Sequence, residues 1–119
     1  DYLFRPWESK QMIGSIIPNY LRNRFNLVYG IASKKLKQFL LLNKEIDIFI
    51  HDSDHTYKNM MFEYDISWPH IKKGGLLISD DVESSNAFYD FSIKKDLKPI
   101  LFFQDLNQKT FLGILQKPI

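Results

Sequence analysis

The 119-residue sequence predicts an α/β fold, in which a mostly parallel sheet carries helices on both faces, and its length suits one domain. Two observations lead to this class. Segments rich in strand-forming residues alternate with segments whose apolar residues recur at helical spacing. Two of the strand segments, 46–50 and 75–79, contain the short continuous apolar runs typical of parallel strands that helices cover.

The N-terminal half alternates strand and helix signals. Its strand segments are 2–4, 25–29 and 46–50, and its helix segments are 9–22 and 33–43. Gly14 and Pro18 predict a kink or an early break in the first of these helices. Ser33 is the predicted N-cap of the second, because its hydroxyl can accept a hydrogen bond from a free backbone N–H.

The C-terminal half continues the alternation and ends in a hairpin. A stripe of apolar residues predicts a helix over 57–71, in which Pro69 restarts the backbone as a short turn and 72–74 supplies a cationic end and a glycine stop. A strand over 75–79 follows, and then a helix capped by Ser84 or Ser85. Strands over 99–103 and 110–115 predict a closing antiparallel hairpin.

The composition excludes several classes of site and partner. The chain has no cysteine, which excludes a disulfide scaffold, a thiolate zinc site and a cysteine nucleophile, and we expect a cytoplasmic location. Lys and Arg number 16 against 14 Asp and Glu and are spread along the chain, so we expect no nucleic-acid partner. No apolar run reaches the ~18–20 residues that span a bilayer, so we expect no membrane partner.

Acidic residues follow the two central predicted strands. The two clusters are His51, Asp52, Asp54 and His55 after the first strand, and Asp80, Asp81 and Glu83 after the second. Ligands bind at the carboxyl ends of strands in open α/β sheets, so we expect both clusters at the functional edge. Carboxylates about 5 Å apart repel by roughly 3 kcal/mol per pair at an effective dielectric near 20. A proton, a Lys or a divalent ion such as Mg²⁺, Ca²⁺ or Mn²⁺ must relieve this repulsion.

Other roles for these residues stay open. Asp at a strand end often caps the next helix or forms a turn, and it can also contact a substrate or cofactor without a metal. His51 and His55 are candidate general bases near neutral pH, or else structural hydrogen-bond partners of the acids. The turn Gly30-Ile31-Ala32 lies between a predicted strand and helix, where its backbone could border a bound ring system.

The segment 46–81 resembles class I methyltransferases of the small-molecule O-methyltransferase type, including relatives similar to cephalosporin hydroxylase. Those proteins show a strand ending in Asp-x-Asp-His-x-Tyr, then Trp-Pro-x-x-Lys-x-Gly-Gly and a strand ending in an acidic pair. The matching residues are Asp52, Asp54, His55, Tyr57, Trp68, Pro69, Lys72, Gly74, Gly75, Asp80 and Asp81. The resemblance covers most of the chain and implies a Rossmann-like fold with S-adenosylmethionine as the methyl donor.

The resemblance also implies roles for particular residues. A divalent metal such as Mg²⁺ would be held by Asp52, Asp80 and Asp81, where it would orient an acceptor hydroxyl and lower its pKa. Gly30, Ile31 and Ala32 match the place where the family contacts the adenine, and Asp52 is expected to contact the cofactor as well. His55 or His51 is then the catalytic base, and the acceptor is a small molecule.

The front of the sequence departs from the family pattern. The family's first strand and glycine-rich turn would precede residue 1, and Arg5 stands where an acid is expected, with Glu8 as a loose substitute. We therefore expect 1–119 to be a single partial methyltransferase domain. The missing central strand would leave unpaired backbone groups. Three arrangements would relieve this: a segment supplied from outside the chain, a sheet that closes in altered order, or a homodimer through the open edge.

Two function hypotheses follow. The first is S-adenosylmethionine-dependent methyl transfer to a small-molecule acceptor, most simply to an oxygen, in the complete parent protein. The second is a truncated or degenerate module without activity that pairs with another chain. A Mg²⁺-dependent phosphotransfer domain is a weaker rival, because the sequence has no phosphate-cradling glycine loop and no suitably placed Lys.

Overall fold

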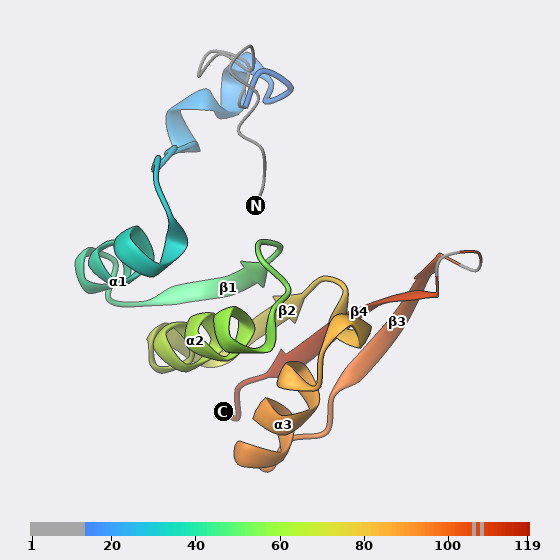
Figure 1. The fold of residues 1–119 in the computed structure, drawn as a ribbon. Helices are drawn as coiled ribbons and strands as arrows, with labels where there is room; N and C mark the ends of the chain where they lie inside the picture. The colour runs from blue at the N-terminus through green and yellow to red at the C-terminus, as the bar shows by residue number, and fades with distance from the viewer. Residues whose placement is uncertain (1–13, 106, 108) are drawn as a thin grey trace.

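The computed structural model describes residues 14–105, 107 and 109–119 (Figure 1). The described residues form four strands and three α-helices, with one 3₁₀ helix before α1 and two more between later elements. The elements in order are η1 (Asn19–Arg24), α1 (Ala32–Leu42), β1 (Ile46–His51), α2 (Tyr57–Ser67), η2 (Trp68–His70), β2 (Ile71–Ser79), η3 (Val82–Ser84), α3 (Ala87–Lys94), β3 (Ile100–Asp105) and β4 (Thr110–Gln116). The α/β class and the closing hairpin are confirmed.

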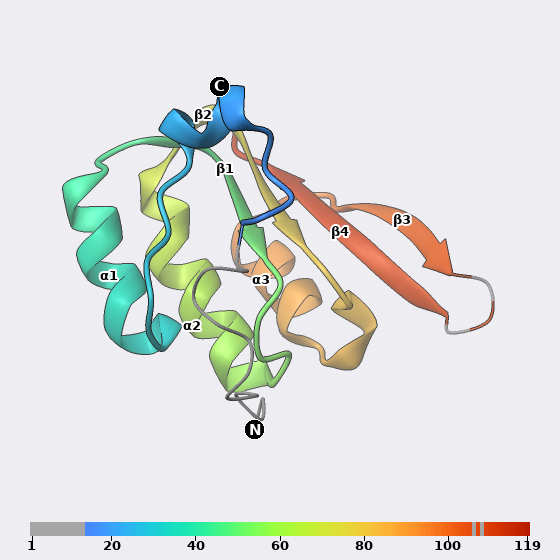
Figure 2. The same ribbon diagram turned by 90° about the horizontal axis from the view of Figure 1, so that it is seen from above.

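The sheet is mixed, in the order β1-β2-β4-β3. β1 and β2 pair in parallel, whereas β4 pairs antiparallel with both β2 and β3. The described strands are therefore less parallel than the sequence predicted, because the closing hairpin inserts its second strand beside β2. β1 and β3 form the two edges of the sheet, and in Figures 1 and 2 the β3–β4 hairpin projects from the body of the domain.

The core lies between one face of the sheet and helices α2 and α3. Its buried side chains come from both helices and from the central strands: Met60, Tyr64, Trp68, Ile71, Leu77, Ala87, Phe88, Phe91 and Leu115. Met60, Tyr64 and Trp68 are four residues apart, so they fall on one side of α2 and its extension into η2. Phe49 of β1 packs against this core.

The other face of the sheet is open in the described part of the chain. α1 lies beside α2, and α2 lies beside α3, so the three helices form one layer (Figure 2). Side chains alternate along a strand, and since Phe49 points to the helices, its neighbours Ile48 and Ile50 point away. These two side chains are 52% and 64% exposed. A second helical layer is thus not among the described residues.

The structure before α1 differs from the helix and strand that the sequence predicted there. In the described part of the helix predicted over 9–22, residues 14–18 form a turn and only a 3₁₀ helix, η1, begins after Pro18, so the α-helix prediction is wrong there. The strand predicted over 25–29 is wrong, because this segment has no regular secondary structure and joins η1 to α1 (Figure 1) without pairing with any of the described strands. The strand at 2–4, the start of the helix at 9–22 and the residues Arg5 and Glu8 lie outside the described residues.

Two predicted helix ends also differ. α1 begins at Ala32 with Ile31 at its N-cap and no side-chain cap, so the prediction for Ser33 is wrong. The predicted helix over 57–74 ends at Ser67, and 71–74 is the start of β2. The reason is a competing partner: the N–H of Gly74 donates to the carbonyl of Lys117 (2.9 Å), and the N–H of Lys117 donates to the carbonyl of Gly75 (2.9 Å).

Replacing Gly75 with alanine is expected to lower the free energy of unfolding by about 2 kcal/mol, as overpacking does in a tight site. A Cβ atom there would lie 2.6 Å from the carbonyl oxygen of Asp47 in β1, and backbone cannot easily give way. Thermal unfolding followed by circular dichroism measures the loss, with Lys73→Ala on the exposed side of the same strand as the control. Equal unfolding temperatures for the two variants would contradict the close approach of β1 and β2.

No helix in the described ranges is both long enough and apolar enough to cross a bilayer.

Candidate functional site

The carboxyl ends of β1 and β2 lie side by side. His51 pairs with Ser79 at the ends of these parallel strands, and the backbone N–H of Asp80 donates to the carbonyl oxygen of His51 (3.0 Å). Figure 2 shows the loops that follow the two strands, and the start of α1, at the same end of the sheet. Both acidic clusters therefore share one edge, where open α/β sheets bind their ligands.

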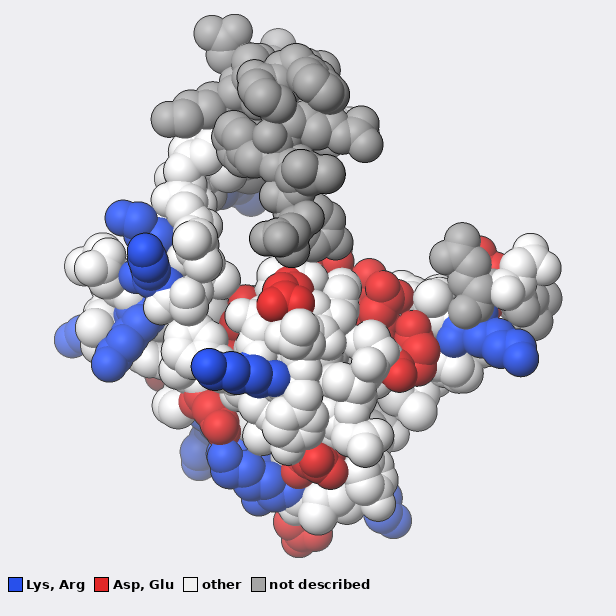
Figure 3. Space-filling view, in the orientation of Figure 1, with Lys and Arg blue, Asp and Glu red and all other residues white. Residues whose placement is uncertain are grey.

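Negative charge gathers at this edge. In Figure 3 acidic side chains lie over the ends of β1 and β2, whereas most Lys and Arg side chains lie over α1 and the lower part of the molecule. Burial raises the pKa of Asp81, and the charges of Asp80 and Glu83 raise it further, against the opposing effect of His55. The repulsion that raises the pKa of Asp81 thus comes mainly from its own cluster, and Asp52 of the other cluster adds the smallest contribution.

Three side chains of the described residues lie close enough to share one metal ion. Asp52, His55 and Asp80 each offer a ligand atom, and these atoms lie within 4.8 Å of one another. Asp81, expected as the third ligand, is outside this group. Its backbone is left-handed (φ 44°), a conformation that Asp tolerates better than most residues. The arrangement therefore differs from the expected set by the presence of His55.

Two of the acids have structural roles. Asp54 accepts hydrogen bonds from the backbone N–H (3.2 Å) and the hydroxyl (3.1 Å) of Thr56, which in turn caps α2 by accepting from the N–H of Asn59 (3.4 Å). Glu83 accepts a hydrogen bond from the backbone N–H of Phe111 (2.9 Å) and so ties the second loop to β4. Asp54 therefore forms a turn, as one of the open alternatives had it, while the helix cap itself is Thr56.

The two candidate bases stand in different surroundings. His51 is fully buried, and its Nδ1 lies 2.7 Å from Oε2 of Glu63, which is 3% exposed. His55 is partly exposed and contributes to the acidic group described above. The two rings meet edge to face, with centroids 5.4 Å apart. His55 is therefore the more exposed of the two histidines, and its Nε2 atom, like that of His51, is buried without a hydrogen-bond partner among the described residues.

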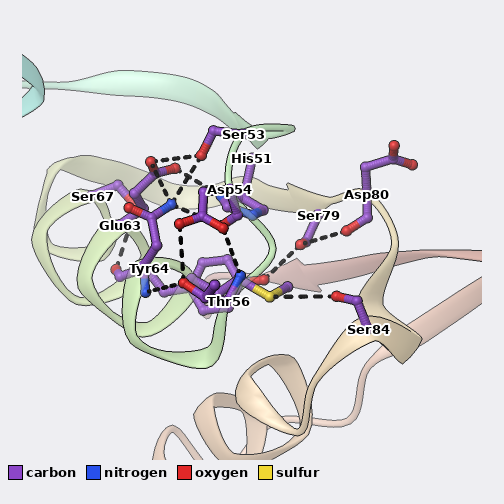
Figure 4. Close-up of polar contacts among 12 residues, drawn as sticks. His51, Ser53, Asp54, Thr56, Glu63, Tyr64, Ser67, Ser79, Asp80 and Ser84 are labelled. Atoms are coloured by element: carbon purple, nitrogen blue, oxygen red, sulfur yellow. Dashed lines mark hydrogen bonds and ion pairs between the residues drawn. The ribbon is translucent and has the colours of Figure 1, made fainter. Parts of the chain in front are cut away.

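Glu63 is the centre of a buried polar network (Figure 4). Besides His51, its carboxylate accepts hydrogen bonds from the hydroxyl of Ser53 (2.8 Å) and the side-chain amide of Asn59 (3.2 Å). Burial pushes the pKa of Glu63 upward, but these hydrogen bonds and the charge of His51 outweigh burial and hold the pKa below its ordinary value. The carboxylate is thus the favoured form in the folded protein.

The lowered pKa of Glu63 predicts a specific loss of stability in acid. A group with a lowered folded pKa contributes stability above its unfolded pKa, and this contribution is lost as pH falls from about 4.5, its ordinary value, through the folded value. The unfolding temperature of the wild-type chain should therefore fall more steeply over this range than that of Glu63→Gln. Parallel curves for the two proteins, measured calorimetrically against pH, would contradict the network.

The sequence contains one indication that Glu63 has a buried partner, namely its position on the apolar stripe of α2. Glu63 lies beside Tyr64 on the apolar stripe of α2, between Met60 and Ser67, and all four are buried. A carboxylate on a buried helix face needs a hydrogen-bonding partner, because its desolvation is otherwise costly. His51, at the end of the preceding predicted strand, is a residue that could supply this hydrogen bond.

The turn before α1 borders a hollow of about 290 Å³. Gly30 and Ala32 line it together with side chains of the preceding segment and of α1: Asn26, Val28, Lys35, Leu36 and Phe39. Gly30 has φ +135°, and a Cβ there would lie 2.8 Å from Cγ of Lys35, so the turn requires glycine. Ile31, the N-cap of α1, is 64% exposed. The hollow therefore lies where the adenine contact was expected.

Comparison with known families decides the classification. A family model described as a methyltransferase domain matches residues 2–82, well over half of the chain. The chain belongs to this methyltransferase domain family. A search of curated proteins gave no match. The matched residues of this class I S-adenosylmethionine-dependent methyltransferase domain include β1, α2, β2 and the acids up to Asp81. The mixed sheet with its closing hairpin agrees with the fold of the family.

Proposed function

We propose that the methyltransferase domain, in its complete parent protein, transfers a methyl group from S-adenosylmethionine to an oxygen of a small-molecule acceptor. The observation that carries this proposal is the group formed by Asp52, His55 and Asp80 at the edge where both loops meet. Carboxylates and an imidazole at such an edge can bind a polar acceptor and take up its proton.

The chain's own residues orient the acceptor and remove its proton. Bound S-adenosylmethionine supplies an electrophilic methyl group on its sulfonium sulfur. We assign Asp52 and Asp80 to holding the acceptor hydroxyl, and His55 to accepting its proton, while the cofactor would lose its methyl group and leave as S-adenosylhomocysteine. The hollow bordered by Gly30 and Ala32 is assigned to the adenine, with Ile31 and Asp52 as further cofactor contacts. The main contribution of the protein is then positioning.

A divalent cation fits the acidic group. Two carboxylates and an imidazole within 4.8 Å can share one ion, and an imidazole among oxygen ligands suits Mn²⁺ better than Mg²⁺ or Ca²⁺. Such an ion, when bound, would orient the acceptor oxygen and lower its pKa. Asp52 and Asp80 would hold it, with His55 or Asp81 completing the set. His55 cannot bind an ion and accept a proton at the same nitrogen.

Titration with Mn²⁺ alone tests this site and separates the two roles of His55. We expect Asp52→Asn and Asp80→Asn to weaken Mn²⁺ binding at least tenfold, because each removes a charged ligand. Electron paramagnetic resonance of free Mn²⁺ measures the affinity. His55→Gln weakens binding to the same extent if the imidazole is a ligand, and leaves it unchanged if His55 is the base. Affinities unchanged in both Asp variants would contradict the metal site.

Activity itself is tested by methyl transfer from radiolabelled S-adenosylmethionine in the parent protein. We expect label to appear in hydroxyl-bearing small molecules, and to appear more slowly in matched amines. Transfer to amines alone would overturn the oxygen acceptor.

The second hypothesis is a module without activity that pairs with another chain. The open edge of β1 and its exposed Ile48 and Ile50 favour it, because an edge strand pairs readily with another strand. A homodimer through this edge would appear in light scattering at micromolar concentration. Ile50→Lys should then give a monomer, and a wild-type monomer would count against the pairing.

A further inference from the structure

We propose that Glu63 and His51 are positioning residues, which set the orientation of His55 and hold the loop that carries Asp52. This inference rests on the proposed function for its catalytic consequence, but its structural part can be tested without activity. The pair lies beneath the acidic group. His51 is the last residue of β1 and Glu63 lies in the middle of α2, so the pair joins the sheet to the helix.

The pair determines which nitrogen of His51 carries a proton. A carboxylate only accepts hydrogen bonds, so at 2.7 Å from Oε2 of Glu63 the Nδ1 atom of His51 must be the donor. The Nε2 atom of His51 is buried and has no hydrogen-bond partner among the described residues. A proton held on Nδ1 of His51 is therefore a specific consequence of Glu63.

The fixed orientation of His51 affects the acidic group through two contacts. Its ring meets the ring of His55 edge to face, with centroids 5.4 Å apart and planes at 88°. Its carbonyl oxygen accepts the N–H of Asp80 (3.0 Å). One residue thus touches His55 from one loop and Asp80 from the other.

The carboxylate of Glu63 also holds the first loop directly. Ser53 donates to Oε1 of Glu63 (2.8 Å), and the Asn59 side chain donates both to Glu63 (3.2 Å) and to the carbonyl of Asp54 (2.9 Å). Figure 4 shows these bonds converging on Glu63. Well-packed apolar residues in place of both Glu63 and His51 would serve folding as well as the buried pair does, whereas replacing one partner alone leaves the other unpaired. The pair is therefore better explained by the orientation that it gives to the loop.

Long-range ¹H–¹⁵N spectra of the histidine rings test the structural part. The chain has three histidines, so the signals are few. We expect the Nδ1 atom of His51 to carry a proton in the wild-type chain. In Glu63→Gln the proton should redistribute between the two nitrogens, and the His55 signals should shift and broaden. Asp65→Asn is the matched control, because Asp65 is a half-exposed carboxylate on the same helix that pairs with Lys94.

Several outcomes would overturn the proposal. One is a wild-type His51 without a proton on Nδ1, which needs no variant to observe. Another is a Glu63→Gln spectrum in which the His55 signals match those of Asp65→Asn. Ser53→Ala, which removes one donor to Glu63, replaces Glu63→Gln if that variant fails to fold, and should broaden the same signals.

Kinetics test the catalytic part. Glu63→Gln should lower kcat on the order of 10- to 100-fold, as misplacement of a catalytic group does, with the KM for S-adenosylmethionine unchanged. Asp65→Asn should match the wild type in both. Unchanged kcat in Glu63→Gln would overturn the positioning role. If no wild-type activity is found, the proposed function has failed, and the ring spectra still decide whether Glu63 orients His55.

Discussion

Replacing Glu63 with leucine is expected to lower the free energy of unfolding by about 3 kcal/mol, the cost of breaking a buried pair from one side. His51 stays buried and loses the acceptor for Nδ1, and Ser53 and Asn59 lose the same acceptor. In a domain of this size such a loss lowers the unfolding temperature by roughly 10–15 °C. Differential scanning calorimetry at neutral pH measures it.

Asp65→Leu on the same helix is the control for this experiment. Asp65 pairs with Lys94 at 2.7 Å, but both side chains are about half exposed, so the pair contributes at most about 1 kcal/mol. A loss in Glu63→Leu no larger than in Asp65→Leu would mean that the buried network does not stabilise the domain.

Replacing His55 with glutamine is expected to lower the rate of methyl transfer about 100- to 1000-fold, within the range lost with a general base. Glutamine keeps a polar side chain of similar size but accepts no proton near neutral pH. Labelled methyl transfer at saturating S-adenosylmethionine measures kcat in the parent protein.

His70→Gln is the matched control, because His70 is partly exposed and lies in η2, which precedes β2 and so lies at the end of the sheet away from the acidic loops. Its kcat should equal that of the wild type. A His55→Gln enzyme that retains more than about a tenth of the wild-type kcat would assign the proton transfer elsewhere.

The fold from β1 onward could largely be predicted from the sequence, and the part before α1 could not. The core strands and the stripe of Met60 and Tyr64 carry strong periodic signals that burial enforces. The segment 25–29 carries the same local signal as a strand, but a strand also needs a neighbour, and none of the described strands reaches it. Similarly, the local sequence of 72–74 predicts a helix end, but hydrogen bonds with Lys117, much later in the chain, make it part of a strand.

The meeting of the two acidic loops could be predicted from the sequence, whereas the buried hydrogen-bond network under them could not. Parallel pairing of β1 and β2 is enough to bring Asp52 and Asp80 together, because their strand ends are in register. The choice of His55 over Asp81 depends on how each loop turns, which sequence spacing does not specify. Glu63 lies 12 residues from His51, on another element, and only the packing of α2 on the sheet joins them.

Calorimetric titration of S-adenosylhomocysteine into the parent protein, with and without Mg²⁺, tests the central claim most directly. The assignment of the Gly30 turn to the cofactor predicts micromolar binding in the wild-type protein. It also predicts much weaker binding in Gly30→Val, because the valine backbone is strained at φ +135° and the side chain would collide with Lys35. Binding that is absent from the wild type, or equal in the two proteins, would contradict a cofactor site at this turn.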